Sequence, residues 1–183
     1  MPAMNVIYLH SHDTGRYIHP YGHAIDTPNL QKLAEEGTLF RQAFCTNPTC
    51  SPSRAALLTG TYPHQNGMTG LAHRGFSLND YGEHIANHLK SFGYTTALAG
   101  VQHVASHKEG EPWKKIGYDR YLGHPGEAEE RAADFLGDPP GQPFFLAVGF
   151  GETHRDYPEE SPEDNPDFCM PPLPLPDTPE TRK

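Results

Sequence analysis

Residues 144–150 read FFLAVGF, an uncharged run of aromatic, aliphatic and glycine residues. Its length and composition predict a strand that is buried on both faces, as in the interior of a parallel sheet. Working outward, residues 5–9 (NVIYL) and 95–99 (TTALA) predict two more strands, and residues 39–44 (LFRQAF) predict another. The chain therefore contains the strands of a buried sheet.

Helices are predicted between these strands. Thr27 is a favourable N-cap and Pro28 a favourable first helical residue, so we expect a helix through residues 30–36. Two further helices are predicted: residues 81–92 and residues 127–136. This alternation predicts an α/β fold with a mostly parallel sheet that is flanked by helices.

Two histidines of the predicted helix 81–92 are four residues apart, which would let both bind one metal ion. They are His84 and His88, and no glutamate follows His84, so the zinc metalloprotease pattern is absent. We expect both to lie on a solvated helix face.

Titratable side chains follow the predicted strands, and in α/β folds chemistry collects at the carboxyl ends of strands. The candidates are His10, His12 and Asp13 after residues 5–9, His103 after residues 95–99, and Glu152 and His154 after residues 144–150. Taken singly, each histidine fits an ordinary surface role. As a set at successive strand ends, they predict a functional site.

Residues 50–60 read CSPSRAALLTG and predict a short helix that stops at Gly60. Cys50 would lie at or just before the helix N-terminus, where unpaired N–H groups and the helix dipole favour anions such as sulfate. Arg54 lies one turn further on and can face the same anion with a planar set of donors. A buried structural cysteine before a core helix is the alternative interpretation.

The CSPSRAALLTG stretch resembles the sulfatase signature, and the resemblance extends over nearly the whole chain. Residues 5–15 resemble the sulfatase opening, residues 59–68 the sulfamidase branch, residues 93–103 the second sulfatase signature, and residues 143–154 a strand leading to a sulfate-contacting histidine. The resemblance implies an alkaline-phosphatase-like fold. It also implies that a maturase oxidises Cys50 to formylglycine, an aldehyde whose hydrate attacks a sulfate ester.

The resemblance assigns roles to five further positions. Asp13 and His12 would join Cys50 as ligands of a divalent cation, and Arg54 would hold the hydrate. His103 would bind substrate and help to expel sulfate, while His154 would bind sulfate or protonate the leaving oxygen. The substrate would be a small-molecule or saccharide sulfate ester or N-sulfate.

Two positions depart from the family pattern. His12 stands where the family has the first of two aspartates, so Ca²⁺, the usual family ion, competes with Mn²⁺ or Zn²⁺, which accept imidazole. Alternatively His12 points away, and His10 or a residue outside this sequence completes the metal site. Val101 replaces a sulfate-contacting lysine, for which Arg16, His107 or Lys108 would have to compensate.

Composition excludes several classes of protein. The chain has 183 residues and a formal net charge of −9 with no basic patch, which argues against a nucleic-acid partner. No apolar run is long enough to span a bilayer. The three cysteines form no disulfide framework, and no signal peptide is visible, so a cytoplasmic location is expected. The sequence predicts no oligomeric state.

The resemblance also predicts the domain organisation. Residues 1–157 would be the N-terminal part of the sulfatase catalytic domain, and residues 158–183 a proline-rich connecting segment leading to a missing C-terminal part. The predicted function is that of a sulfuric ester hydrolase, inactive as this fragment alone. A phosphate or phosphonate monoester hydrolase on the same fold, or a non-catalytic truncated remnant, remain alternatives.

Overall fold

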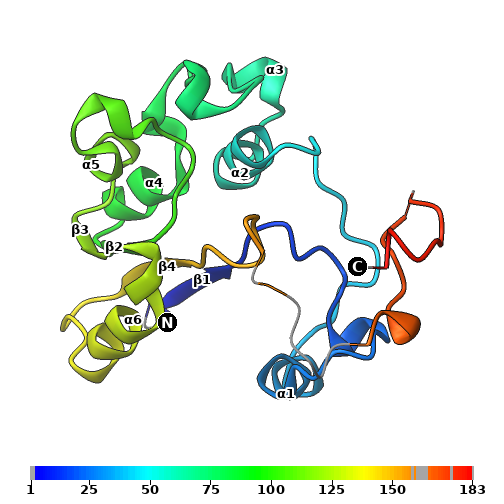
Figure 1. Cartoon of the computed structure of the whole chain (residues 1–183). Coiled ribbons are helices and arrows are strands. Elements are labelled where there is room, and N and C mark those ends of the chain that lie inside the picture. The colour runs from blue at the N-terminus through cyan, green and yellow to red at the C-terminus, as the bar shows by residue number, and fades with distance from the viewer. Residues whose placement is uncertain (1–2, 158, 160–164, 174, 183) are drawn as a thin grey trace.

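A parallel sheet organises the chain. The computed structural model describes residues 3–157, 159, 165–173 and 175–182. Within these residues there are four strands: β1 (Val6–His10), β2 (Thr95–Gly100), β3 (Arg120–Gly123) and β4 (Phe144–Gly149). All pair in parallel, in the order β1-β4-β2-β3 (Figure 1).

Helices cover both faces of the sheet, with α4 and α5 on one side and α6 on the other (Figure 1). The α-helices are α1 (Pro28–Glu36), α2 (Cys50–Thr59), α3 (Pro63–Asn66), α4 (Ile85–Ser91), α5 (Pro112–Ile116) and α6 (Ala128–Gly137). Short 3₁₀ helices are η1 (His19–Tyr21), η2 (Ala72–Arg74), η3 (Tyr81–Glu83), η4 (His107–Glu109), η5 (Pro125–Glu127) and η6 (Pro166–Phe168). None of the helices in the described part of the chain is both long and apolar enough to cross a membrane.

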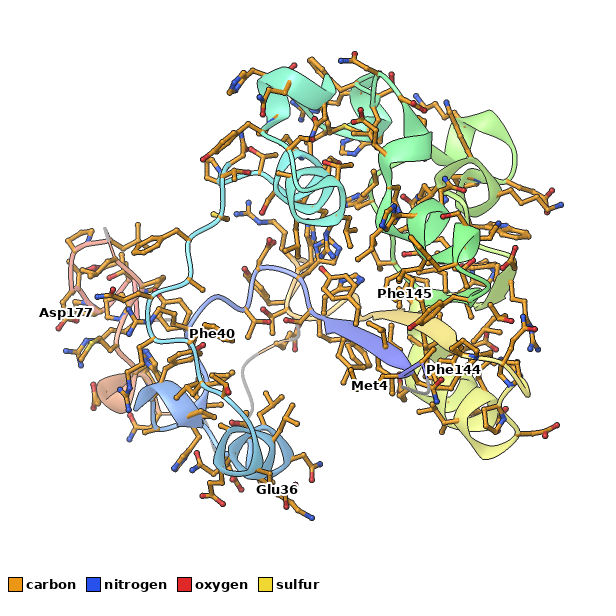
Figure 2. The ribbon with its side chains drawn as sticks, turned by 180° about the vertical axis from the view of Figure 1, so that it is seen from behind. Met4, Glu36, Phe40, Phe144, Phe145 and Asp177 are labelled. Atoms are coloured by element: carbon orange, nitrogen blue, oxygen red, sulfur yellow. The ribbon has the colours of Figure 1, made fainter. Side chains whose placement is uncertain are left out.

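The β4 strand is buried on both faces and divides the core in two. Phe145 and Ala147 point into one cluster, which includes Ile116 of α5. Phe144 and Val148 join the opposite cluster with α6 (Figure 2). This alternation follows from the pleat of a strand, in which neighbouring side chains point to opposite faces. The expected α/β fold with its parallel sheet is confirmed.

Two glycines allow the loops after β2 and β4 to leave the sheet in close contact. A Cβ atom on Gly149 would lie 2.2 Å from the Val101 carbonyl oxygen and 2.5 Å from Cε1 of His10. A Cβ atom on Gly100 would lie 2.1 Å from the Gly149 carbonyl oxygen, and Gly100 has φ +81°. No other residue fits this arrangement without displacing backbone.

The strand predicted at residues 39–44 is wrong. This stretch forms an irregular extended connection between α1 and α2, and Phe40 lies in it well away from the sheet (Figure 2). Phe40 is 68% exposed and Phe44 is 89% exposed, so the apolar side chains of the stretch do not face a core. The strand β3 was not predicted, because its four residues RYLG carry no clear alternation.

The helix predicted over residues 81–92 divides at His84, whose backbone is extended (φ −68°, ψ 138°). Nδ1 of His84 accepts a hydrogen bond from the backbone N–H of Ala86 at 3.1 Å, so the imidazole caps α4. The expected solvated face is wrong for His84, which is 1% exposed, and is confirmed for His88, which is exposed. The two histidines therefore do not form a helical metal pair.

The proline-rich segment 158–183 contains one short helix in its described residues, η6. Arg182 pairs with Asp177, and its Nη1 donates to the Asp167 carbonyl at 2.8 Å. Residues 158, 160–164, 174 and 183 of this predicted segment lie outside the described residues. The expected connecting role remains a prediction.

Burial of His84 predicts a pH-dependent stability. Burial lowers its pKa to about 4, whereas the unfolded chain binds the proton near pH 6.5. Between these values the unfolded state binds more protons, so stability falls as the pH drops from about 6.5 to about 4, by roughly 2–3 kcal/mol for this group. We expect His84→Asn, which retains a capping acceptor, to flatten this part of the profile. Urea unfolding at several pH values measures it, and an unchanged slope in the variant would contradict the assignment.

Candidate active site

The hydrogen-bond ladder between β1 and β4 continues past the ends of both strands. The N–H of Phe150 donates to the His10 carbonyl at 2.9 Å, and the N–H of His12 donates to the Glu152 carbonyl at 2.7 Å. The N–H of Thr153 then donates to the His12 carbonyl at 2.7 Å. The loop after β1 is therefore tied to the loop after β4, and the two loops present their side chains at the same edge.

Three side chains at this edge form a possible metal site. Each of His12, Asp13 and His154 offers one ligand atom, and these atoms lie within 4.8 Å of one another. Nε2 of His154 lies 4.0 Å from Oδ2 of Asp13. His12 is buried, and its Nδ1 has no hydrogen-bond partner within the residues that the structure describes. A buried polar atom without a partner is costly, so a ligand for this imidazole would stabilise the site.

His103 brings the loop after β2 to the same place. Its ring centroid lies 5.2 Å from that of His12 and 6.0 Å from that of His73. His103 has φ +57° and Asp13 has φ +55°, a left-handed conformation that is uncommon outside glycine. Such strained positions are enriched at functional sites.

Gln102 holds the loop that carries His103. This side chain is buried, and its Oε1 accepts from the N–H of Ala105 at 2.8 Å. Its Nε2 donates to the Ala105 carbonyl at 2.7 Å. Because both ends of the amide are satisfied within the loop, Gln102 fixes the turn from which His103 projects.

Helix α2 contributes Cys50 as its first residue and Arg54 one turn later. Arg54 is buried, with Nη2 donating to the Ser11 carbonyl at 3.2 Å and Nη1 in contact with Nδ1 of His10. Cys50, Arg54 and Asp13 line a cavity of about 310 Å³. The local fold therefore places a cysteine, a buried cation and a carboxylate around one space.

Burial keeps the imidazoles of His10, His12 and His103 neutral. Burial, together with the nearby charges of Arg54 and His12, lowers the pKa of His10 to about 3. Burial, reinforced mainly by His12, lowers the pKa of His103 to about 4. Burial also lowers the pKa of His12. Near pH 7 these rings are therefore available as metal ligands or proton acceptors rather than as acids.

A second, larger cavity of about 610 Å³ lies on the other side of His12, and its lining includes His103 and His154. Val101 and His107 also line it. Among the described residues, neither Arg16 nor Lys108 belongs to this lining, and Arg16 instead stacks over the ring of Tyr21 at 5.5 Å. Of the three residues considered as compensation for Val101, only His107 thus faces the cavity.

The structure brings most of the predicted site residues to one edge, although their roles remain predictions. Glu152 is exposed and lines a third cavity, which Asp13 also lines but His12, His103 and His154 do not. Sequence reasoning missed Gln102, His73 and the aromatic wall of the larger cavity, Trp113 and Tyr121. Gln102 could have been suspected because it directly precedes His103. No sequence motif marks Trp113 or Tyr121.

Comparison with protein families and curated proteins gives one consistent result. A model of the sulfatase family matches residues 4–132. N-acetylgalactosamine-6-sulfatase of Rattus norvegicus is 39% identical over 126 residues, which cover 62% of this chain and 23% of the relative. N-sulphoglucosamine sulphohydrolase of Homo sapiens is 33% identical over 165 residues, which cover 82% of this chain and 32% of the relative. The chain therefore spans about a quarter to a third of the length of these relatives.

Solved structures share the fold. A protein solved in complex with its substrate D-glucosamine-2-N,6-O-disulfate superimposes with a TM-score of 0.69 and 25% identity, over 83% of this chain and 35% of the other. Phosphonate monoester hydrolase of Agrobacterium radiobacter superimposes with a TM-score of 0.65 and 21% identity, over 86% of this chain and 43% of the other. The latter likeness concerns the fold alone.

The contact between Arg54 and His10 predicts a difference between two substitutions. His10→Leu removes an acceptor from a buried guanidinium, and we expect it to destabilise the fold by about 1–3 kcal/mol. His10→Asn keeps an acceptor near the position of Nδ1 and should cost clearly less. Urea unfolding of both variants at pH 7 measures the difference. Equal stability of the two would show that the acceptor does not matter to Arg54.

Proposed function

We propose that the chain supplies the N-terminal part of a hydrolase that acts on a sulfate ester or N-sulfate of a sugar. The chain belongs to the sulfatase family, because the family model matches most of its residues. The names of two relatives support a saccharide, since one acts on N-acetylgalactosamine 6-sulfate and the other on N-sulphoglucosamine. A C-terminal part would complete the catalytic domain, because the matched relatives are several times longer.

The observation that carries this proposal is the meeting of two sets of residues at the edge of β1. Cys50 and Arg54 share one cavity with Asp13, while His12, His103 and His154 line the adjoining one. His12 and Asp13 are consecutive, so the two cavities meet at the possible metal site. A sulfate group placed at this junction would face a nucleophile position, a buried cation and three imidazoles.

Cys50 fits the position of formylglycine. It is the first residue of α2 and only half-buried, so a substrate can reach it in the folded chain. Formylglycine supplies a nucleophilic oxygen at this place. Arg54 contributes a fixed positive charge beside it, which stabilises negative charge that develops on sulfate oxygens.

The donor set of His12, Asp13 and His154 fits a divalent cation. Two imidazoles and one carboxylate are softer than the all-oxygen sites that Ca²⁺ prefers, so we infer Mn²⁺ or Zn²⁺. A bound cation supplies positive charge that polarises the sulfate oxygens. The unpartnered Nδ1 of His12 supports this assignment.

The remaining residues move protons and hold the substrate. His103 is neutral near pH 7 because burial lowers its pKa to about 4, so it could accept a proton from the hydroxyl group of the formylglycine hydrate that does not carry sulfate. His154 is exposed beside Asp13, so it either completes the metal site or contacts sulfate and donates to the leaving oxygen; one nitrogen cannot do both. Gln102 keeps His103 in place through its loop.

A phosphate or phosphonate monoester hydrolase is the second candidate, and the shared fold of phosphonate monoester hydrolase is the observation that favours it. Rates on glucosamine N-sulfate, glucosamine 6-sulfate and a phosphate monoester separate the two. A higher kcat/KM on the phosphate monoester would overturn the sulfatase proposal. If none of the three substrates is hydrolysed, the non-catalytic remnant is the interpretation that stands.

Cys50→Ala tests the nucleophile. In the protein purified from its native host, the tryptic peptide of residues 42–54 should have the mass of formylglycine at position 50. We expect Cys50→Ala to lower kcat by at least about a thousandfold with an unchanged melting temperature, because a nucleophile in a covalent mechanism has no substitute. Cys169→Ala, an exposed cysteine outside both cavities, is the matched control. Activity retained by Cys50→Ala would reject the role.

Metal preference tests the donor set. We expect Mn²⁺ or Zn²⁺ to raise the melting temperature of the metal-stripped protein more than Ca²⁺ does at equal concentration. His12→Asp restores an oxygen ligand and should shift this preference toward Ca²⁺. His88→Asp, at an exposed position on α4, is the control and should change nothing. The same preference in wild type and His12→Asp would show that His12 is not a ligand.

A further inference from the structure

The larger cavity has an aromatic wall that the proposed chemistry does not use. Trp113 from α5 and Tyr121 from β3 both line it and are both half-buried. Their ring centroids lie 6.2 Å apart and their planes differ by 16°. The two rings stack with nearly parallel planes, so the flat apolar surface that they add to the cavity lining is the ring face that the stack leaves open.

Polar groups surround this wall. Glu111 and His124 line the same cavity and are exposed, and the His124 ring meets the edge of Tyr121 at a centroid distance of 6.0 Å. Lys114 pairs with Glu111 at 2.5 Å and lies 5.0 Å from the Trp113 ring centroid, which restricts the position of the indole. A flat apolar surface with polar groups at its margin suits a ligand that has one apolar face and several hydroxyl groups.

The same cavity reaches the candidate active site. His12, His103 and His154 line its other end. Its volume of about 610 Å³ lies within the range of small-molecule sites. A ligand that fills it would place an anionic group beside the cation that His12, Asp13 and His154 could hold, and a ring at the aromatic end.

We propose that Trp113 and Tyr121 form the binding subsite for the sugar ring of the substrate, with the sulfate group directed toward His12, His103 and His154. This assignment rests on the proposed function and gives it a location for the saccharide. The C–H face of a pyranose packs on the rings, and its hydroxyl groups meet Glu111 and His124. The subsite binds the part of the substrate that does not react, so it contributes chiefly to affinity.

The composition of the chain offers a direct measurement. Trp113 is the single tryptophan among the 183 residues, so intrinsic tryptophan fluorescence reports on this cavity. We expect glucosamine N-sulfate to change the fluorescence in a saturable way. No saturable change at millimolar concentration would overturn the assignment of the subsite.

Two variants make the test specific. Tyr121→Ala should weaken binding of glucosamine N-sulfate about three- to tenfold, the range of a lost aromatic contact. Tyr121→Leu keeps much of the volume if the alanine variant is unstable, and should weaken binding similarly because the flat face is lost. The matched control is Tyr62→Ala, an exposed tyrosine stacked on His64 outside the cavity, which should bind as the wild type does. Unchanged affinity in Tyr121→Leu would overturn the proposal.

Two further readouts separate this inference from the proposed function. Inorganic sulfate, measured by its effect on the melting temperature, should bind equally to wild type and Tyr121→Leu, because it needs only the histidine end. In the active protein, Tyr121→Leu should raise KM for glucosamine N-sulfate and leave kcat nearly unchanged. Sugar binding that depends on Tyr121 without hydrolysis would reject the proposed activity and keep the subsite. Hydrolysis by Tyr121→Leu with an unchanged KM would keep the proposed activity and reject the subsite.

Discussion

The hydrogen-bond ladder between β1 and β4 is the interaction on which the candidate site depends. It pairs Val6 with Phe145 and His10 with Gly149, and it extends beyond the strands to the backbone of His12 and Thr153. A ladder that continues into two loops fixes both loops relative to each other, which isolated side-chain contacts do not achieve. The proximity of Asp13 and His154 is therefore a property of the sheet and not of the loops alone.

Patterns that depend on local composition could be predicted from the sequence. Residues 144–150 are apolar because β4 is buried on both faces, and the helix from Cys50 follows from its proline and its terminal glycine. The stretch 39–44 has the apolar content of a strand but no neighbour in the described sheet, and only tertiary structure reveals that. His84 shows the same limit, since nothing local distinguishes a buried capping imidazole from one on a solvated face.

Site residues that directly follow a strand could be predicted from the sequence. Site residues whose positions depend on packing between elements could not. His12, Asp13, His103 and His154 each follow a strand, so topology alone brings them to one edge. Trp113 and Tyr121 come from a short helix and the edge strand that follows it, and no sequence pattern marks the contact between their rings. The support that Gln102 gives to His103 arises from a loop conformation that has no sequence signature.

The same ladder also sets the order in which the molecule can assemble. Asn5 accepts a hydrogen bond from Phe144 across 139 positions of sequence, so β1 is made long before its partner strand. During synthesis β1 has to wait, with Ile7 and Leu9 unpaired, until β4 has left the ribosome. Closing so long a loop is slow compared with forming the helices. His10 and His12 therefore reach the positions described here only after β4 has been made, and a nascent chain that stops short of β4 carries them without this geometry.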